Sequence, residues 1–185
     1  AEPSYLASPT GGAAVSAAVA QGPSFHPIRP GQPILLDYVF AHQGYLADHT
    51  RIFCLGELPA DLARAQADMV AIQDEIKPLM VPGTPAGAVY DKAVDLAAAA
   101  GYEEYFMGCG ATRIRFVGHG VGLELDEYPF LAKGQEMVLA ENMVVALEPK
   151  VIFPGKGVVG IENTHVVTPE GLRQLTRAEE RIVIV

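Results

Sequence analysis

Residues 34–55 read ILLDYVFAHQGYLADHTRIFCL and carry the pattern that decides the fold. Two runs rich in aliphatic and aromatic residues, 34–40 and 45–55, flank a short segment, 41–44, that ends in glycine. Strand-forming runs separated by so few turn-forming residues predict a β-hairpin.

The hairpin is expected to bring two aspartates together. A register that is symmetric about the midpoint between residues 42 and 43 sets Asp37 directly opposite Asp48. Two carboxylates in facing positions repel each other unless a cation lies between them. Because Arg51 is the only basic residue nearby in the sequence, a divalent metal ion is the simplest neutralising cation to predict.

Helices and further strands are expected on the C-terminal side of the hairpin. Apolar residues recur every three or four positions over 58–80, which predicts an amphipathic helix, and a second helix follows Thr84-Pro85 as far as residue 100. Short apolar runs between turns then predict strands at the segments 114–118, 143–147, 158–167 and 181–185. The order of strands, helices and strands indicates an α+β fold built on a mostly antiparallel sheet.

The segment before the hairpin differs in composition from the rest of the chain. Residues 1–33 are rich in Gly, Pro, Ala and Ser and predict irregular structure with one short strand near Tyr5. With no linker long enough to separate a second domain, residues 1–185 are predicted to form one domain.

Charge and composition exclude several classes of partner. The chain has 50% hydrophobic residues and a net charge of −9, so a real core is expected, and neither nucleic acid nor an anionic membrane is a predicted partner. No apolar run approaches the roughly 20 residues that span a bilayer, and no secretory signal is recognisable. A cytoplasmic protein is therefore expected.

Three acidic residues lie within apolar segments that are predicted to be strands: Asp37, Glu148 and Glu162. A buried, unpaired carboxylate costs several kcal/mol, so each needs a cation or a proton. With Asp48, and with His119 in the segment GHGVG, they form a set suited to two divalent ions such as Mn, Co, Fe or Zn. Taken singly, a strand aspartate is more often an edge residue and a Gly-His-Gly segment more often a loop. A nucleotide loop is not expected, because the Lys-Ser/Thr pair of such loops is absent.

These residues resemble the pita-bread metallopeptidases, which include methionine aminopeptidase, aminopeptidase P, prolidase and the metal-free relative creatinase. The segments that carry the resemblance are, in chain order, LD at 36–37, GYLADHTR at 44–51, GHGVGLE at 118–124, LEP at 147–149 and IEN at 161–163. The sequence around His119 and Glu148 is more similar to the Xaa-Pro peptidase branch of the family than to the methionine aminopeptidase branch. The resemblance implies a curved, mostly antiparallel sheet with helices packed on one face.

The resemblance also implies roles for the five residues. Asp37 would chelate one metal ion, Asp48 and Glu162 would bridge two ions, and His119 and Glu148 would complete the second site. Glu148 would act as the general base toward a hydroxide that bridges both ions. The implied reaction is removal of an N-terminal residue or cleavage of a dipeptide, often before proline, and a homodimer is expected by analogy.

The sequence departs from the family pattern in three ways. Where family peptidases usually have a histidine seven residues after His119, this chain has Asp126, which cannot donate a hydrogen bond when ionised. A second substrate-side histidine is missing at its usual position, and His26 is the nearest candidate to replace it. The leading helices of the family domain are also not recognisable, so a fragment of a longer chain or a shortened relative is expected.

Two functions therefore stay open at this point. The five-residue set favours a metal-dependent exopeptidase of the Xaa-Pro type. The two missing histidines favour a non-peptidase or impaired relative that keeps the metal site and binds another small amide or a protein partner. The three other histidines are expected on turns or strand surfaces: His42, His49 and His165.

Overall fold

The computed structural model describes residues 25–110 and 113–185. Its helices are α1 (Ala60–Ile76) and α2 (Ala86–Ala99), with the 3₁₀ turn η1 (Lys77–Leu79) directly after α1. Its strands are β1 (Pro33–His42), β2 (Tyr45–Cys54), β3 (Gly118–Gly120), β4 (Val144–Leu147), β5 (Lys150–Phe153), β6 (Gly157–Gly160), β7 (Asn163–Thr168), β8 (Gly171–Gln174) and β9 (Val183–Ile184). The strand predicted near Tyr5 lies outside the described residues.

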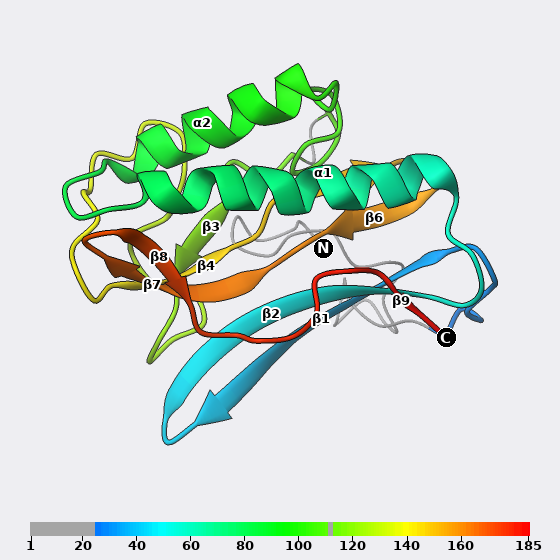
Figure 1. Ribbon diagram of the computed structural model, residues 1–185, viewed down its shortest axis with the longest axis horizontal. Coiled ribbons are helices and arrows are strands. Elements are labelled where there is room, and N and C mark those ends of the chain that lie inside the picture. Colours follow the sequence, from blue (N-terminus) through cyan, green and yellow to red (C-terminus); the bar gives the residue numbers. More distant parts are fainter. Residues whose placement is uncertain (1–24, 111–112) are drawn as a thin grey trace.

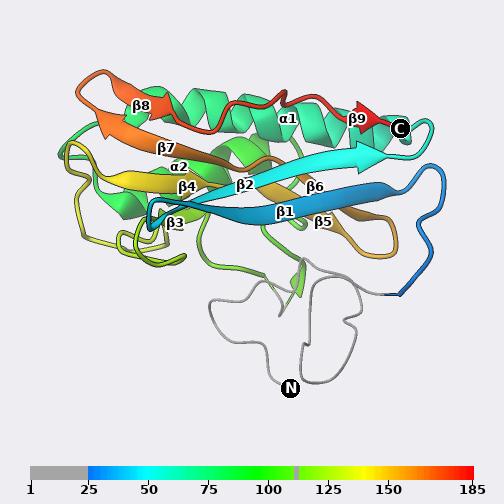
Figure 2. The same cartoon turned by 90° about the horizontal axis from the view of Figure 1, so that it is seen from below.

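The strands form a curved layer, and the helices cover one face of it (Figures 1 and 2). The hydrogen-bonded orders are β1-β2-β9, β3-β4-β7-β8 and β5-β6, and among the strands of the described residues only the β2–β9 pair is parallel. A bridge between Thr50 and Glu162 joins the hairpin sheet to the central strands. The predicted α+β fold with helices on one face is confirmed.

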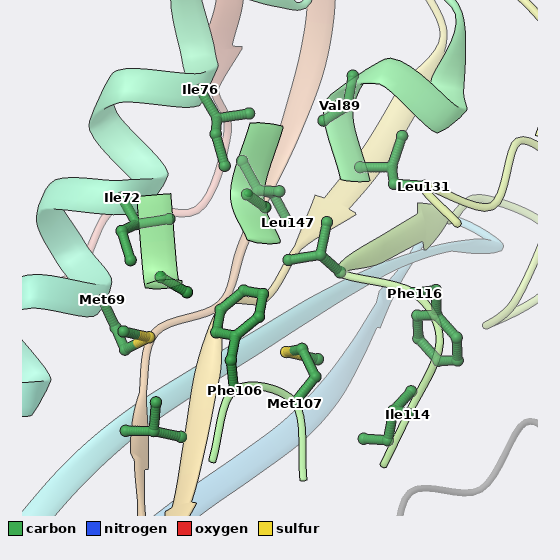
Figure 3. Close-up of a cluster of buried hydrophobic side chains, with 14 of the residues drawn as sticks. Met69, Ile72, Ile76, Val89, Phe106, Met107, Ile114, Phe116, Leu131 and Leu147 are labelled. Atoms are coloured by element: carbon green, nitrogen blue, oxygen red, sulfur yellow. The ribbon is translucent and has the colours of Figure 1, made fainter. Parts of the chain in front are cut away.

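The core lies between the helices and the strands (Figure 3). Helix α1 contributes the predicted apolar stripe, including Met69, Ile72 and Ile76, each at most 5% exposed. Its buried face also includes Gln66 and Gln73, which the apolar stripe does not predict. Within the described part of the chain, neither helix is long and apolar enough to cross a bilayer.

The hairpin forms as predicted, but its predicted register is wrong. Asp37 pairs with Thr50, and Asp48 pairs with Val39. The turn is the pair Gln43-Gly44, whose φ values of 52° and 86° are both positive, as in the two-residue turn that suits the twist of a hairpin. The turn centre therefore lies one residue later than expected. Because cross-strand partners share a face of the sheet, Asp37 and Asp48 still lie on the same face, displaced along it.

Other strand boundaries differ where the chain changes its pairing partner. Residues 114–117 are not a strand, and β3 begins only at Gly118. The strand predicted over 158–167 is divided into β6, which pairs with β5, and β7, which pairs with β4 and β8. Glu162 lies at this division. Strands β5 and β8 were not predicted; each is four residues long and pairs with the neighbouring strand in the chain across a short turn.

Candidate metal centre

The five predicted ligand residues converge from five separate segments. Asp37 lies on β1, Asp48 on β2 and His119 on β3, while Glu148 follows β4 and Glu162 lies between β6 and β7. Four of them are buried, with at most 6% exposure, whereas the Asp37 side chain is 36% exposed. Asp37 therefore forms the solvent edge of an otherwise enclosed cluster.

His119 directs one ring nitrogen at the carboxylates. Its Nε2 lies 3.9 Å from Asp48 Oδ2 and 3.7 Å from Glu148 Oε1. Its Nδ1 lies 2.9 Å from the Gly120 carbonyl oxygen. Since a carbonyl can only accept, Nδ1 carries the proton in this bond, and neutral His119 keeps the lone pair of Nε2 facing the carboxylates.

The backbone around Asp48 is held from two sides. The Thr164 hydroxyl accepts a hydrogen bond from the Asp48 N–H at 2.8 Å and donates one to the Asp48 carbonyl at 2.9 Å. The His49 N–H donates to Asp48 Oδ1 at 2.9 Å. With Oδ1 occupied in this way, Oδ2 is the oxygen directed at His119.

Helix α1 and strand β2 fix the segments that carry the two glutamates. Gln73 Nε2 donates to the carbonyl of Leu147 at 2.8 Å, and Gln73 Oε1 accepts from Asn163 Nδ2 at 2.9 Å. These partners directly adjoin Glu148 and Glu162. The Thr50 hydroxyl donates to Glu162 Oε2 at 2.7 Å. Sequence reasoning missed these supporting residues because their contacts join distant segments.

The residue most clearly missed by the sequence analysis is Lys150. Its side chain is 2% exposed, and its Nζ lies 2.8 Å from Glu148 Oε2, 3.1 Å from Glu162 Oε2 and 3.5 Å from Asp37 Oδ2. The sequence signal that could have indicated Lys150 is a lysine two residues after Glu148 in an otherwise apolar segment. A protein cation therefore lies where the sequence analysis expected only metal ions.

The cluster perturbs the ionisation of its members. Burial, reinforced by the neighbouring Glu162 and Asp37, raises the pKa of Asp48 to about 8. Burial also raises the pKa of Glu162, although Lys150 opposes this shift. Burial would lower the pKa values of His119 and Lys150, but the surrounding carboxylates outweigh it, so both are raised. The carboxylates thus repel one another and favour a cation.

The donor set fits a divalent ion on the His119 side. One ligand atom from each of Asp48, His119 and Glu162 lies within 4.8 Å of the other two. Oxygen and imidazole ligands lie about 2.0–2.2 Å from a bound Zn²⁺, so donors around one ion are about 3–4 Å apart. The 3.7 and 3.9 Å separations about His119 Nε2 match this spacing. A mixed set of one imidazole and carboxylates suits Zn, Mn, Fe or Co.

The other candidate residues have separate positions. Asp126 Oδ1 lies 3.6 Å from His119 Nδ1, on the ring side that faces away from Asp48 and Glu148. His26 is exposed in the irregular segment before β1, so its substrate role stays a prediction. His42 is exposed as expected. The expectation is wrong for His49 and His165, which are 5% and 0% exposed, because consecutive residues of β2 and β7 are buried, so neither face of these strands is open to solvent there.

This combination of curved sheet, covering helices and carboxylate–histidine cluster is that of a pita-bread metallopeptidase. The sequence model of metallopeptidase family M24 matches residues 3–169, so the chain belongs to that family.

Individual relatives agree with this assignment. A Xaa-Pro dipeptidase from Lactobacillus delbrueckii is 33% identical over 89% of this chain and 43% of its own length. A dipeptidase structure from Pyrococcus horikoshii matches with a TM-score of 0.81 and 34% identity, covering 89% of this chain and 44% of that one. A methionine aminopeptidase from Rickettsia prowazekii, at 18% identity, TM-score 0.66 and coverage of 84% and 68%, shares the fold. The chain thus spans less than half the length of the dipeptidases that it matches.

Proposed function

We propose that this chain forms the metal-binding catalytic part of an exopeptidase that removes an N-terminal residue or splits a dipeptide, with Xaa-Pro bonds as its substrates. The observation that carries the proposal is His119 Nε2 facing Asp48 Oδ2 and Glu148 Oε1 at the spacing of metal donors. Membership of a metallopeptidase family and the names of the similar dipeptidases support it.

A divalent ion bound beside His119 would polarise the scissile carbonyl and acidify a water molecule. Glu148 is the residue that we assign to proton transfer, because its Oε1 faces the same space as His119 Nε2. It accepts the proton of the attacking water and passes it to the leaving amine. The Gly120 carbonyl keeps the proton of His119 on Nδ1, so Nε2 stays a ligand. Asp126 on that side adds a negative charge that favours the same tautomer.

Several finer expectations stay predictions. The sequence alone predicts two ions joined by a hydroxide, a number that the contacts of Lys150 oppose. The choice of manganese, a cytoplasmic location and a homodimer are further predictions. The substrate-side roles of Asp126 and His26 belong to the same group.

A second function has specific support from Asp126 and Lys150. Ionised Asp126 cannot donate a hydrogen bond to a substrate as a histidine would, and Lys150 binds the other oxygen of Glu148. An impaired relative that keeps the metal site but binds a different small amide or a protein partner is therefore the alternative.

Peptide hydrolysis separates the two functions. The full protein containing this chain, loaded with Mn²⁺ or Co²⁺, should release free proline from Xaa-Pro dipeptides. Glu148→Gln should lower kcat about 10²–10⁴-fold, the usual contribution of a general base, with metal content measured in parallel. Glu141→Gln, at an exposed position, is the matched control and should leave kcat unchanged. No turnover of dipeptides or tripeptides at any metal level would contradict the peptidase and favour the alternative.

A further inference from the structure

The ammonium group of Lys150 lies inside the carboxylate cluster rather than beside it. It contacts one oxygen each of Glu148, Glu162 and Asp37, at 2.8, 3.1 and 3.5 Å. We propose that Lys150 permanently takes the place of one of the two expected cations, so that the site binds a single divalent ion on the His119 side. This inference builds on the metal centre of the proposed function but does not require that peptides be cleaved.

The two oxygens of Glu148 divide the cluster into two halves. Oε2 accepts a hydrogen bond from Lys150, whereas Oε1 faces His119 Nε2 at 3.7 Å. Asp37 belongs to the lysine half through its contact with Nζ, and it is not part of the group formed by Asp48, His119 and Glu162. The half that Asp37 would use to chelate an ion therefore already holds a cation.

A second ion could not bind the lysine half without displacing Nζ. It would have to share the oxygens of Asp37, Glu148 and Glu162 with an ammonium that already contacts all three. Two positive charges so close together in a buried space repel each other strongly. The four carboxylates and Lys150 carry a formal excess of three negative charges, which one divalent ion nearly neutralises and two would reverse.

The fold provides space for the lysine side chain. Lys150 pairs with Gly160 across β5 and β6, and a Cβ at position 160 would lie 2.6 Å from Lys150 Cγ. The missing side chain of Gly160 thus leaves room for the aliphatic stem. The backbone of Lys150 is held by Met107, because the Met107 N–H donates a hydrogen bond to the Lys150 carbonyl at 2.9 Å. Because Lys150 is 2% exposed, its charge cannot simply turn into solvent.

Metal stoichiometry tests the proposal without a peptidase assay. The full wild-type protein, saturated with Mn²⁺ and desalted, should retain one ion per chain by elemental analysis. Its electron paramagnetic resonance spectrum should show isolated Mn²⁺ and not an exchange-coupled pair. Two retained ions, a coupled-pair spectrum or no retained ion would each overturn the proposal.

Substitutions assign the ion to one half of the cluster. Asp37→Asn should leave the count at one, whereas Asp48→Asn should abolish retention. Lys150→Ala should raise the count to two, and the Lys150→Ala, Asp37→Asn double variant should return it to one. Lys156→Ala removes an exposed lysine that pairs with Asp61 and should leave the count at one.

The outcomes that oppose the proposal are equally specific. Loss of the wild-type ion in Asp37→Asn, or a folded Lys150→Ala protein that still holds one ion, would overturn it. If Lys150→Ala does not fold, the wild-type count and the Asp37→Asn count decide. Failure of the peptidase proposal would leave these metal counts unchanged, so the two proposals can fail separately.

Discussion

At the scale of single residues, the face of the sheet decides which cation serves the carboxylates. Arg51 is the nearest basic residue to Asp48 in the sequence, but successive strand residues point to opposite faces, so Arg51 and Thr50 diverge. The Arg51 guanidinium donates to backbone carbonyls, including those of Thr50 and Glu162, and to the Asn163 side chain. Lys150, about a hundred positions later, supplies the charge instead.

His165 should make the stability of the protein depend on pH. Burial, assisted by Lys77 and opposed by Asp74, lowers the pKa of His165 to about 3. Between pH 6.5 and 3 the unfolded chain therefore binds a proton that the folded chain does not, so stability falls as the pH falls through this window. Each pH unit below 6.5 should remove about 1.4 kcal/mol through this residue.

Urea denaturation at pH 7 and pH 5 measures this effect. His165→Leu should reduce the loss of unfolding free energy between the two pH values by up to about 2 kcal/mol. His42→Leu, at an exposed position, should leave the loss as in the wild type. An equal loss in wild type and His165→Leu would show that this histidine does not contribute.

At the scale of elements, the hairpin and α1 position the cluster in different ways. The Gln43-Gly44 turn sets the register that brings Thr50, rather than Asp48, opposite Asp37. Helix α1 acts through its side chains, since Gln73 bonds to residues next to both glutamates. An amphipathic pattern identifies such a helix but does not distinguish a buried glutamine that supports a site from a solvated one.

Replacing Gln73 should therefore weaken both the fold and the metal centre. Gln73→Met keeps a similar volume but leaves the Leu147 carbonyl without this donor and Asn163 without this acceptor, which should cost about 1–3 kcal/mol of unfolding free energy. Mn²⁺ affinity should also fall, because these groups hold the segments of Glu148 and Glu162. Urea denaturation and calorimetric titration measure the two effects. Glu75→Met on the exposed face of α1 is the control, and equal behaviour of the two variants would contradict the assigned role.

At the scale of the whole molecule, five chain segments hold like charges together. The pKa of Asp48 is raised to about 8 by burial and by Glu162 and Asp37, which shows that the fold opposes the full ionisation of its own site. The bridge between Thr50 and Glu162 joins two sheets at this point, so the repulsion acts where the sheets meet. Metal binding should consequently stabilise the entire fold.

Metal addition and removal should be visible in the melting temperature. At an Mn²⁺ concentration of about 100 Kd, binding to the folded state should add about 2.7 kcal/mol of stability. For a protein of this size that corresponds to a rise in Tm of about 5–10 °C, which a chelator should reverse. Differential scanning calorimetry measures the shift. Asp48→Asn should show none, and a wild-type Tm insensitive to both additions would contradict a metal centre.

The sequence by itself determined the hairpin, both helices and the four acidic residues and one histidine that meet in the cluster. Hydrophobic periods of two and about 3.6 are local properties, and the family motifs are short and contiguous. The tertiary structure alone decided the register of Asp37, the division of the chain at Glu162, the burial of His165 and the position of Lys150. These depend on turn geometry and on contacts between distant segments, which a linear pattern does not determine; even the lysine two residues after Glu148 gives no indication of which carboxylates it contacts. The contacts of Lys150 with three carboxylates of the cluster are therefore the feature that the motifs predict least.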